Sequence, residues 1–199
     1  MKHKDISNQI IALKNEDIVL RDKLIECRQL SDGYNKEMAE LHNYNAEKLN
    51  KIIDKIGYPT LEKVGKKGNE AAWLIIQHSI GRPSFMRKCA RLLEIAVNQN
   101  EAQAIHLAYL KDRIAVFEGR PQYYGTQFDW DINGEMSPQQ YDDLNKVNDR
   151  RKSLSINSLE EQTQVVRAQV KKEKQTPPKD FNQRKKEIEV WRKSVGWIK

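Results

Sequence analysis

Apolar residues recur at helical spacing through most of this 199-residue chain, and this pattern restricts the fold more than any other feature. Residues 5–30 and 35–56 place apolar side chains three or four positions apart, which is the stripe of an amphipathic helix. Asp5 or Ser7 is the expected cap of the first helix. The helices end where glycine or proline interrupts the pattern. These breaks fall at residues 31–33, 57–60 and 175–178, and further helices are predicted at about 71–78, 83–97, 101–118, 137–152, 158–174 and 180–194.

One segment departs from the helical pattern. Residues 127–132 alternate polar and apolar side chains, and Asn133-Gly134 follows them. An Asn-Gly pair after alternating residues is a strong hairpin signal. We therefore predict a mainly α fold, a single-domain multi-helix bundle with one small β-hairpin near residues 126–136. Its expected parts are an N-terminal amphipathic helix at 1–33, a helical core with a polar pocket at 34–155, and basic C-terminal helices docked on the core at 156–199.

Composition narrows the class of protein. Hydrophobic residues make up 38% of the chain and charged residues 32%, which suits helices with wide solvated faces. No apolar run is long enough to span a membrane, and the charged N-terminus has no secretory signal. We expect a soluble cytoplasmic protein with reduced cysteines. Cys89 has basic neighbours that could lower its thiol pKa, but a structural role is favoured for both Cys27 and Cys89.

The charge is unevenly distributed. Residues 1–150 carry equal numbers of basic and acidic side chains, so the net charge of +7 comes entirely from residues 151–199. A basic tail of this kind could engage nucleic acid or an acidic protein. Interleaved glutamates in the same helices favour an ordinary solvated face instead.

Polar residues in two helices are candidates for chemistry. Gln77 and His78 end an otherwise apolar segment, where His78 is either a general acid or base or a core histidine bonded to a backbone carbonyl. Asp112 and Arg113 lie among apolar residues of a later helix. Arg113 then either anchors an anionic ligand or forms a structural ion pair.

The loop that follows, residues 119–127, is the third candidate. Pro121 and Gly125 shape a bend that cannot be helical. Its polar side chains either hold a ligand or fasten the loop itself. They are Gln122, Tyr124, Thr126 and Gln127.

Metal binding is not predicted from spacing. The histidines at positions 3, 42, 78 and 106 show no metal-type motif. Asp129, Asp131 and Asn133-Gly134 match the first half of a calcium loop, but position 140 is Gln instead of the required carboxylate. A hairpin explains the same residues, so we predict no metal and no cofactor.

Several short motifs, in order, resemble a widespread bacterial family of unknown function. The family's pattern is GWPT, VG, AAW, QH, LxDR and QxYGTQ, with a Trp where this chain has Tyr58. Asn45, the paired arginines at 150–151 and the ending at 191–197 are also similar, so the resemblance covers about residues 35–199. It implies no established activity. The matching segments here are Gly57-Tyr58-Pro59-Thr60, Val64-Gly65, Ala71-Ala72-Trp73, Gln77-His78, Leu110-Lys111-Asp112-Arg113 and Gln122-Tyr123-Tyr124-Gly125-Thr126-Gln127.

These observations lead to a hypothesis of a polar pocket for a small anionic or carboxylate-bearing ligand. Arg113 would anchor the ligand, Gln122 and Gln127 would orient it, and His78 would move a proton. The reaction class would be a metal-independent hydrolase or transferase. The alternative is a non-catalytic binding module that uses the basic C-terminal region. The oligomeric state is left open, because Asp17 interrupts the apolar stripe that could form a coiled coil.

Overall fold

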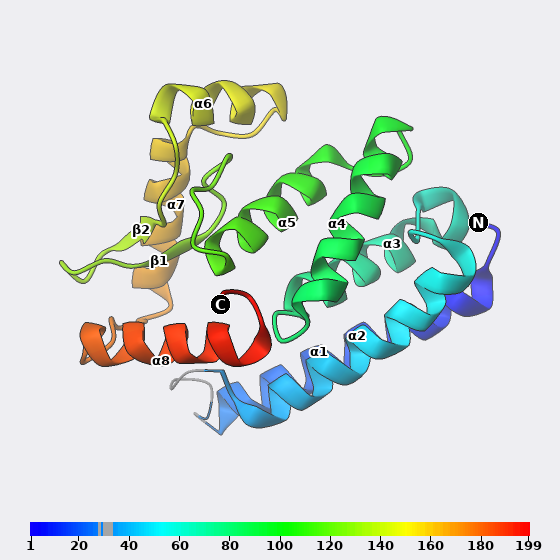
Figure 1. Cartoon of the computed structure of the whole chain (residues 1–199), viewed down its shortest axis with the longest axis horizontal. Helices are drawn as coiled ribbons and strands as arrows, with labels where there is room; N and C mark the ends of the chain where they lie inside the picture. The colour runs from blue at the N-terminus through cyan, green and yellow to red at the C-terminus, as the bar shows by residue number, and fades with distance from the viewer. Residues whose placement is uncertain (28, 30–33) are drawn as a thin grey trace. The chain divides into compact units, whose positions relative to one another are not determined.

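A computed structural model describes residues 1–27, 29 and 34–199 (Figure 1). The predicted mainly α fold with one small antiparallel hairpin is confirmed. The chain packs as two compact units, Met1–His106 and Leu107–Lys199, and the boundary falls within α5 (Ala104–Phe117). The break expected at residues 31–33 lies outside the described residues, and the three-part division of the chain stays a prediction.

The first unit is built from helices that pack on one another around an aliphatic core. Its helices are α1 (Lys4–Glu26), α2 (Lys36–Ile56), α3 (Leu61–His78), α4 (Pro83–Asn98) and the start of α5. The core side chains include Ile10, Leu24, Leu49, Ile53, Ile75, Ile76, Met86 and Leu93. Asn35 caps α2 by accepting a hydrogen bond from the backbone of Met38, and Gly57 ends it with a φ of 70°.

Helices α1 and α2 run antiparallel, side by side (Figure 1). The Asn45 side chain donates to the carbonyl of Leu13, and His42 contacts Asp17. From Leu13 to Asp17 the chain advances four residues on α1, while the contacted residues on α2 go back three, from Asn45 to His42. Burial on α2 follows the same spacing, because its buried positions include 38, 42, 45, 49 and 52.

Helices α1 and α3 approach closely near the start of each. Ser7 Oγ donates to the carbonyl oxygen of Val64 over 2.6 Å, so Ser7 is a buried contact. Helix α1 follows His3 and has no side-chain cap, so neither Asp5 nor Ser7 caps it as predicted. Gly65 interrupts α3 with a φ of 70°. A Cβ atom at Gly68 would lie 2.5 Å from Ser7 Oγ. A side chain at this position would force Ser7 or the helices to shift, so this contact constrains the distance between the two helices.

The second unit contains the predicted hairpin, formed by β1 (Phe128–Trp130) and β2 (Met136–Pro138). Trp130 pairs with Met136, so the connection spans residues 131–135 and includes Asn133-Gly134. Asp131 Oδ1 accepts backbone hydrogen bonds from residues 133 and 135, which holds this loop closed.

The helix predicted at 137–152 begins later than expected. The structure places α6 at Leu144–Ser153, where the side chain of Asp143 caps the first turn. Ser137 does not act as the cap. Its hydroxyl donates to Asp131, and Pro138 ends a strand in which its missing N–H is tolerated.

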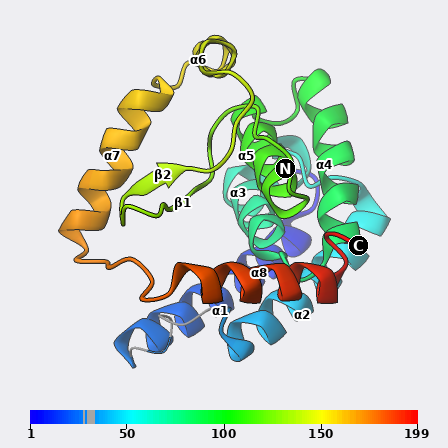
Figure 2. The same ribbon diagram turned by 60° about the vertical axis from the view of Figure 1, so that its left-hand side comes forward.

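The C-terminal helices agree with the prediction. Helix α7 (Leu159–Lys172) starts with a capping box formed by Ser158 and Glu161. Helix α8 (Phe181–Val195) starts after the cap Asp180. Figure 2 shows α7 beside β2, which it contacts.

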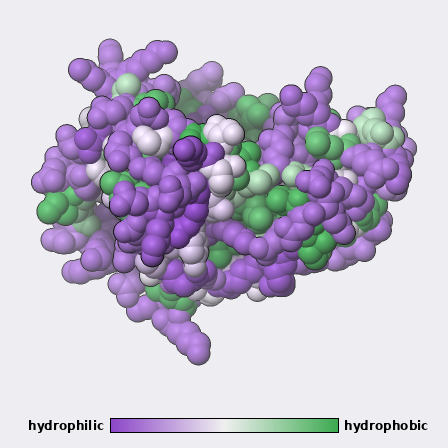
Figure 3. Space-filling model, turned by 90° about the horizontal axis from the view of Figure 1, so that it is seen from above, coloured by the Kyte–Doolittle hydropathy of each residue, from purple (hydrophilic) through white to green (hydrophobic). Residues whose placement is uncertain are grey.

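The surface shown in Figure 3 is mainly hydrophilic, with apolar groups scattered between charged ones. This agrees with amphipathic helices whose charged faces are solvated. Within the described residues, the helices are all too short or too polar to cross a bilayer.

Candidate acid–base centre in the first unit

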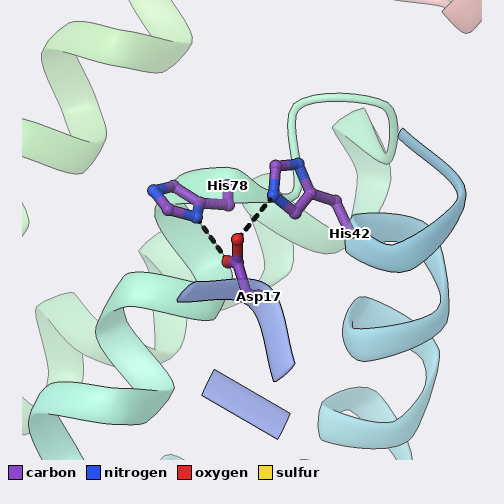
Figure 4. Close-up of side chains that lie close together, drawn as sticks. All are labelled: Asp17, His42 and His78. Carbon is purple, nitrogen blue, oxygen red and sulfur yellow. Dashed lines mark hydrogen bonds and ion pairs between the residues drawn. The ribbon is translucent and has the colours of Figure 1, made fainter. Parts of the chain in front are cut away.

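Asp17 lies at the centre of a cluster formed by three helices of the first unit (Figure 4). Its side chain is 1% exposed. Oδ1 lies 3.1 Å from Nε2 of His42 on α2, and Oδ2 lies 2.6 Å from Nδ1 of His78 at the end of α3. One buried carboxylate therefore holds two imidazole rings, whose centroids are 5.0 Å apart.

The surroundings of Asp17 favour the ionised form of its carboxylate. Burial alone would raise its pKa, but the hydrogen bonds from His42 and His78 outweigh that effect and hold the pKa well below its usual range. A buried charge needs such partners, because an isolated carboxylate in an apolar interior is strongly disfavoured.

His42 is held from both sides. Its Nδ1 lies 2.7 Å from the hydroxyl of Tyr34, and the two rings stack with centroids 5.8 Å apart. Burial, with the nearby charge of Asp17, raises the pKa of Tyr34, so the phenol keeps its proton. In the neutral ring these partners assign the tautomer: Nε2–H donates to Asp17, and Nδ1 accepts from Tyr34.

His78 is the more accessible of the two rings, with 28% of its side chain exposed. Its Nδ1–H donates to Asp17, so the lone pair of the neutral ring lies on Nε2. Figure 4 shows this second nitrogen on the side of the ring away from Asp17. A carboxylate that fixes the tautomer of an imidazole in this way prepares the other nitrogen to act as a base.

The sequence analysis found His78 but missed the other members of the cluster. The alternative of a backbone carbonyl partner for the His78 ring is wrong, because the ring nitrogen bonds to a carboxylate. Two signals were present. Asp17 lies seven residues after Ile10 and seven before Leu24, so it shares their buried face of α1. His42 occupies a buried position of α2.

Gln77, the neighbour of His78, is buried within α3. The remaining predicted site residues belong to the second unit, where they organise a loop. Asp112 is fully buried, and its carboxylate accepts backbone hydrogen bonds from Tyr123, Tyr124 and Thr126, and another from the Thr126 hydroxyl. Burial raises the pKa of Asp112 despite these bonds.

The other polar side chains of the loop take part in the same structure. Gln122 is fully buried, donates to the carbonyl of Gln127 and accepts from its N–H. Arg113 Nε donates to Gln127 Oε1 over 3.0 Å, and burial lowers the pKa of Arg113 to about 10. The carbonyl of Tyr124 accepts from Arg151. These contacts explain the residue types of the loop, while a ligand pocket shared with His78 stays a prediction.

Two other features of the sequence have structural explanations. Cys89 is fully buried, and burial raises the pKa of its thiol to about 12, which contradicts the alternative of a reactive thiolate. In the segment that resembled a calcium loop, Asp131 fastens the hairpin connection, and Asp129 forms an ion pair with Arg184 of α8.

Comparison with known proteins places the chain in a family without assigning an activity. A family model described as a family of unknown function (DUF6624) matches residues 4–172. It includes the α1 residues that the resemblance left out, Asp17 among them, and it ends before α8. Searches of curated proteins and of solved structures gave no match.

Proposed function

The chain belongs to the DUF6624 family, whose function is unknown, and we propose that it is a hydrolase or transferase in which His78 acts as general acid and base. The observation that carries this proposal is the 2.6 Å contact between His78 Nδ1 and Asp17 Oδ2, which leaves the lone pair of His78 on the more accessible side of the cluster. This is the arrangement by which a carboxylate prepares an imidazole for proton transfer.

In the proposed reaction, one nitrogen of His78 accepts and then returns a single proton. His78 Nε2 removes a proton from water or from a hydroxyl group of the acceptor as its oxygen attacks an electrophilic carbonyl or phosphoryl centre. The resulting imidazolium is stabilised by the ionised carboxylate of Asp17. The same nitrogen then returns the proton to the leaving group, so the ring ends in its starting state. General acid–base catalysis of this type contributes about 10²–10⁴-fold to a rate.

The remaining members of the cluster support this role by fixing Asp17. His42 donates to the second carboxylate oxygen and is itself held by Tyr34. Asp17 therefore cannot rotate away from His78 without leaving a buried imidazole N–H unpaired, which costs about 1–3 kcal/mol. We assign Asp17, His42 and Tyr34 as positioning residues and His78 as the catalytic residue.

The activity test uses a panel of activated carboxylic and phosphoric esters in buffer containing a chelator. We expect His78→Gln to lower the rate of the best substrate by at least about 10²-fold, and Asp17→Asn to lower it similarly because the tautomer changes. His3→Gln is the matched control, since His3 lies at the start of α1 outside the cluster. Equal rates for the His78 variant and the wild type on every substrate that turns over would refute the proposal.

A second readout needs no substrate. Nitrogen NMR of the imidazole rings reports which nitrogen carries the proton. In the neutral ring of His78 we expect the proton on Nδ1 in the wild type and a shift toward Nε2–H in Asp17→Asn, where the amide NH₂ can donate to Nδ1. Conservation of the kcat of the wild type in a variant with the shifted tautomer would contradict the assigned role of Nε2.

A further inference from the structure

The same cluster has the composition of a transition-metal site. Asp17 offers a carboxylate oxygen, His42 offers Nε2 and His78 offers Nδ1, and these three ligand atoms all lie within 4.8 Å of one another. Two imidazoles and one carboxylate are a donor set that suits zinc and related divalent ions, whereas calcium and magnesium prefer oxygen ligands. Three protein ligands leave a further coordination position for water.

The helices bring these atoms together before any ion arrives. The antiparallel register of α1 and α2 sets His42 against Asp17. The close approach of Ser7 and Gly68 sets α3 beside α1. Asp17 and His78 each lie ten residues further along their helices, about 15 Å away, and there they contact each other. A metal would therefore bind with little loss of conformational freedom.

Tyr34 supplies the support that metal-binding histidines usually have. If His42 Nε2 is to bind a cation, its proton must move to Nδ1, and the hydroxyl oxygen of Tyr34 lies 2.7 Å from that nitrogen as an acceptor. A hydrogen bond of this kind orients the ring and raises the basicity of the ligating nitrogen.

We propose that Asp17, His42 and His78 also bind one divalent transition-metal ion of the zinc class, and that the metal-bound state and the acid–base state exclude each other. The exclusion follows from the tautomers of His78. When Nδ1 binds the ion, the proton of the neutral ring lies on Nε2, and that nitrogen has no lone pair with which to accept another. Metal binding itself is independent of the proposed reaction, but the exclusion rests on the acid–base role of His78.

Binding is measured with the full chain, freed of metal by a chelator and dialysed. Calorimetry with Zn²⁺ should give one ion per chain, and Co²⁺ should give the visible absorption of a low-coordinate nitrogen and oxygen site. Asp17→Asn and His78→Asn should each weaken binding by more than about tenfold, and His3→Asn should bind like the wild type. Absence of one-to-one binding, or equal affinity in the Asp17 variant, would overturn the proposal.

A milder variant guards against loss of folding in the ligand variants. Tyr34→Phe keeps the ring and removes only the hydroxyl that supports His42. Its affinity for Zn²⁺ should fall by about 10-fold or more, with an unchanged circular dichroism spectrum. Unchanged Zn²⁺ affinity in this folded variant would overturn the assigned support of His42 by Tyr34, and unchanged affinity in the Asp17 variant would overturn the ligand set.

The exclusion is tested on any ester substrate that the wild type turns over. One equivalent of Zn²⁺ should abolish the His78-dependent rate, and a chelator should restore it. If Zn²⁺ binds at the cluster and raises the rate, the exclusion and the metal-independent reaction both fail, although the metal site stands. If no ion binds while His78→Gln still abolishes the rate, the metal proposal fails and the acid–base role stands.

Discussion

Gly68 offers a direct test of how α1 and α3 are positioned. In the variant Gly68→Ala, the new Cβ would lie 2.5 Å from Ser7 Oγ and 3.0 Å from Val64 Cβ. Ser7 Oγ is fixed by its hydrogen bond to the Val64 carbonyl, so neither neighbour is the free end of a long side chain. Overpacking of a close contact costs about 1–3 kcal/mol, and the upper end applies here. Alanine recovers about 1 kcal/mol of helix propensity. The net loss of unfolding free energy should be about 2 kcal/mol.

A double-mutant cycle separates this contact from other effects. Ser7→Ala removes the hydroxyl and should cost about 1 kcal/mol, because the buried Val64 carbonyl loses its donor. In that background, Gly68→Ala should cost about 1 kcal/mol or less, which gives a coupling of about 1–2 kcal/mol between the two sites. Urea unfolding, followed by circular dichroism at matched m-values, measures all four proteins. A Gly68→Ala protein as stable as the wild type, or an equal cost in both backgrounds, would refute the reasoning.

Three further predictions concern single groups. Asp112→Asn should lower the unfolding free energy by about 2–4 kcal/mol, because an amide NH₂ would face backbone donors, and a loss below about 0.5 kcal/mol in urea unfolding would contradict this. The hydrogen bond from Arg150 lowers the pKa of Asp142 to about 2. The stability from this pair is therefore present above the unfolded pKa near 4 and is lost as the pH falls toward 2. Asp142→Asn should make the unfolding free energy, measured by urea unfolding, fall less steeply between about pH 4 and pH 2 than in the wild type, and an unchanged slope would contradict this. Alkylation of the native protein at about pH 8 should label exposed Cys27 and spare Cys89, whose pKa is raised to about 12 by burial, and equal labelling would show that Cys89 is accessible.

Periodicity along the chain predicted most of the helices, because helices such as α2 and α4 bury one stripe of their own residues. The error at residues 137–152 came from interpreting Ser137-Pro138 as a helix start. The hydroxyl of Ser137 instead donates a hydrogen bond to Asp131. Short polar residues can satisfy a helix end or a loop equally well, and only the partner decides which.

The candidate site was predictable only in part. His78 was visible because a histidine at the end of an apolar helix must find a partner. Its partner, Asp17, lies 61 positions away along the chain. For the loop at residues 119–127 the sequence left two alternatives open, a ligand site or a loop fastened by its own side chains, and the structure supplies hydrogen bonds from the loop to Asp112. A polar pattern in sequence shows that partners are required but does not say whether they come from the protein or from a ligand.

The sequence by itself determined most of the helices and the hairpin, because these depend on residues a few positions apart. Tertiary structure alone decided that Asp17 receives both His42 and His78. That meeting depends on the register of α1 with α2 and on the approach of α1 to α3 at Gly68. Both are set by packing between segments distant in the chain, where a shift of one residue would turn a side chain about 100° away from its partner.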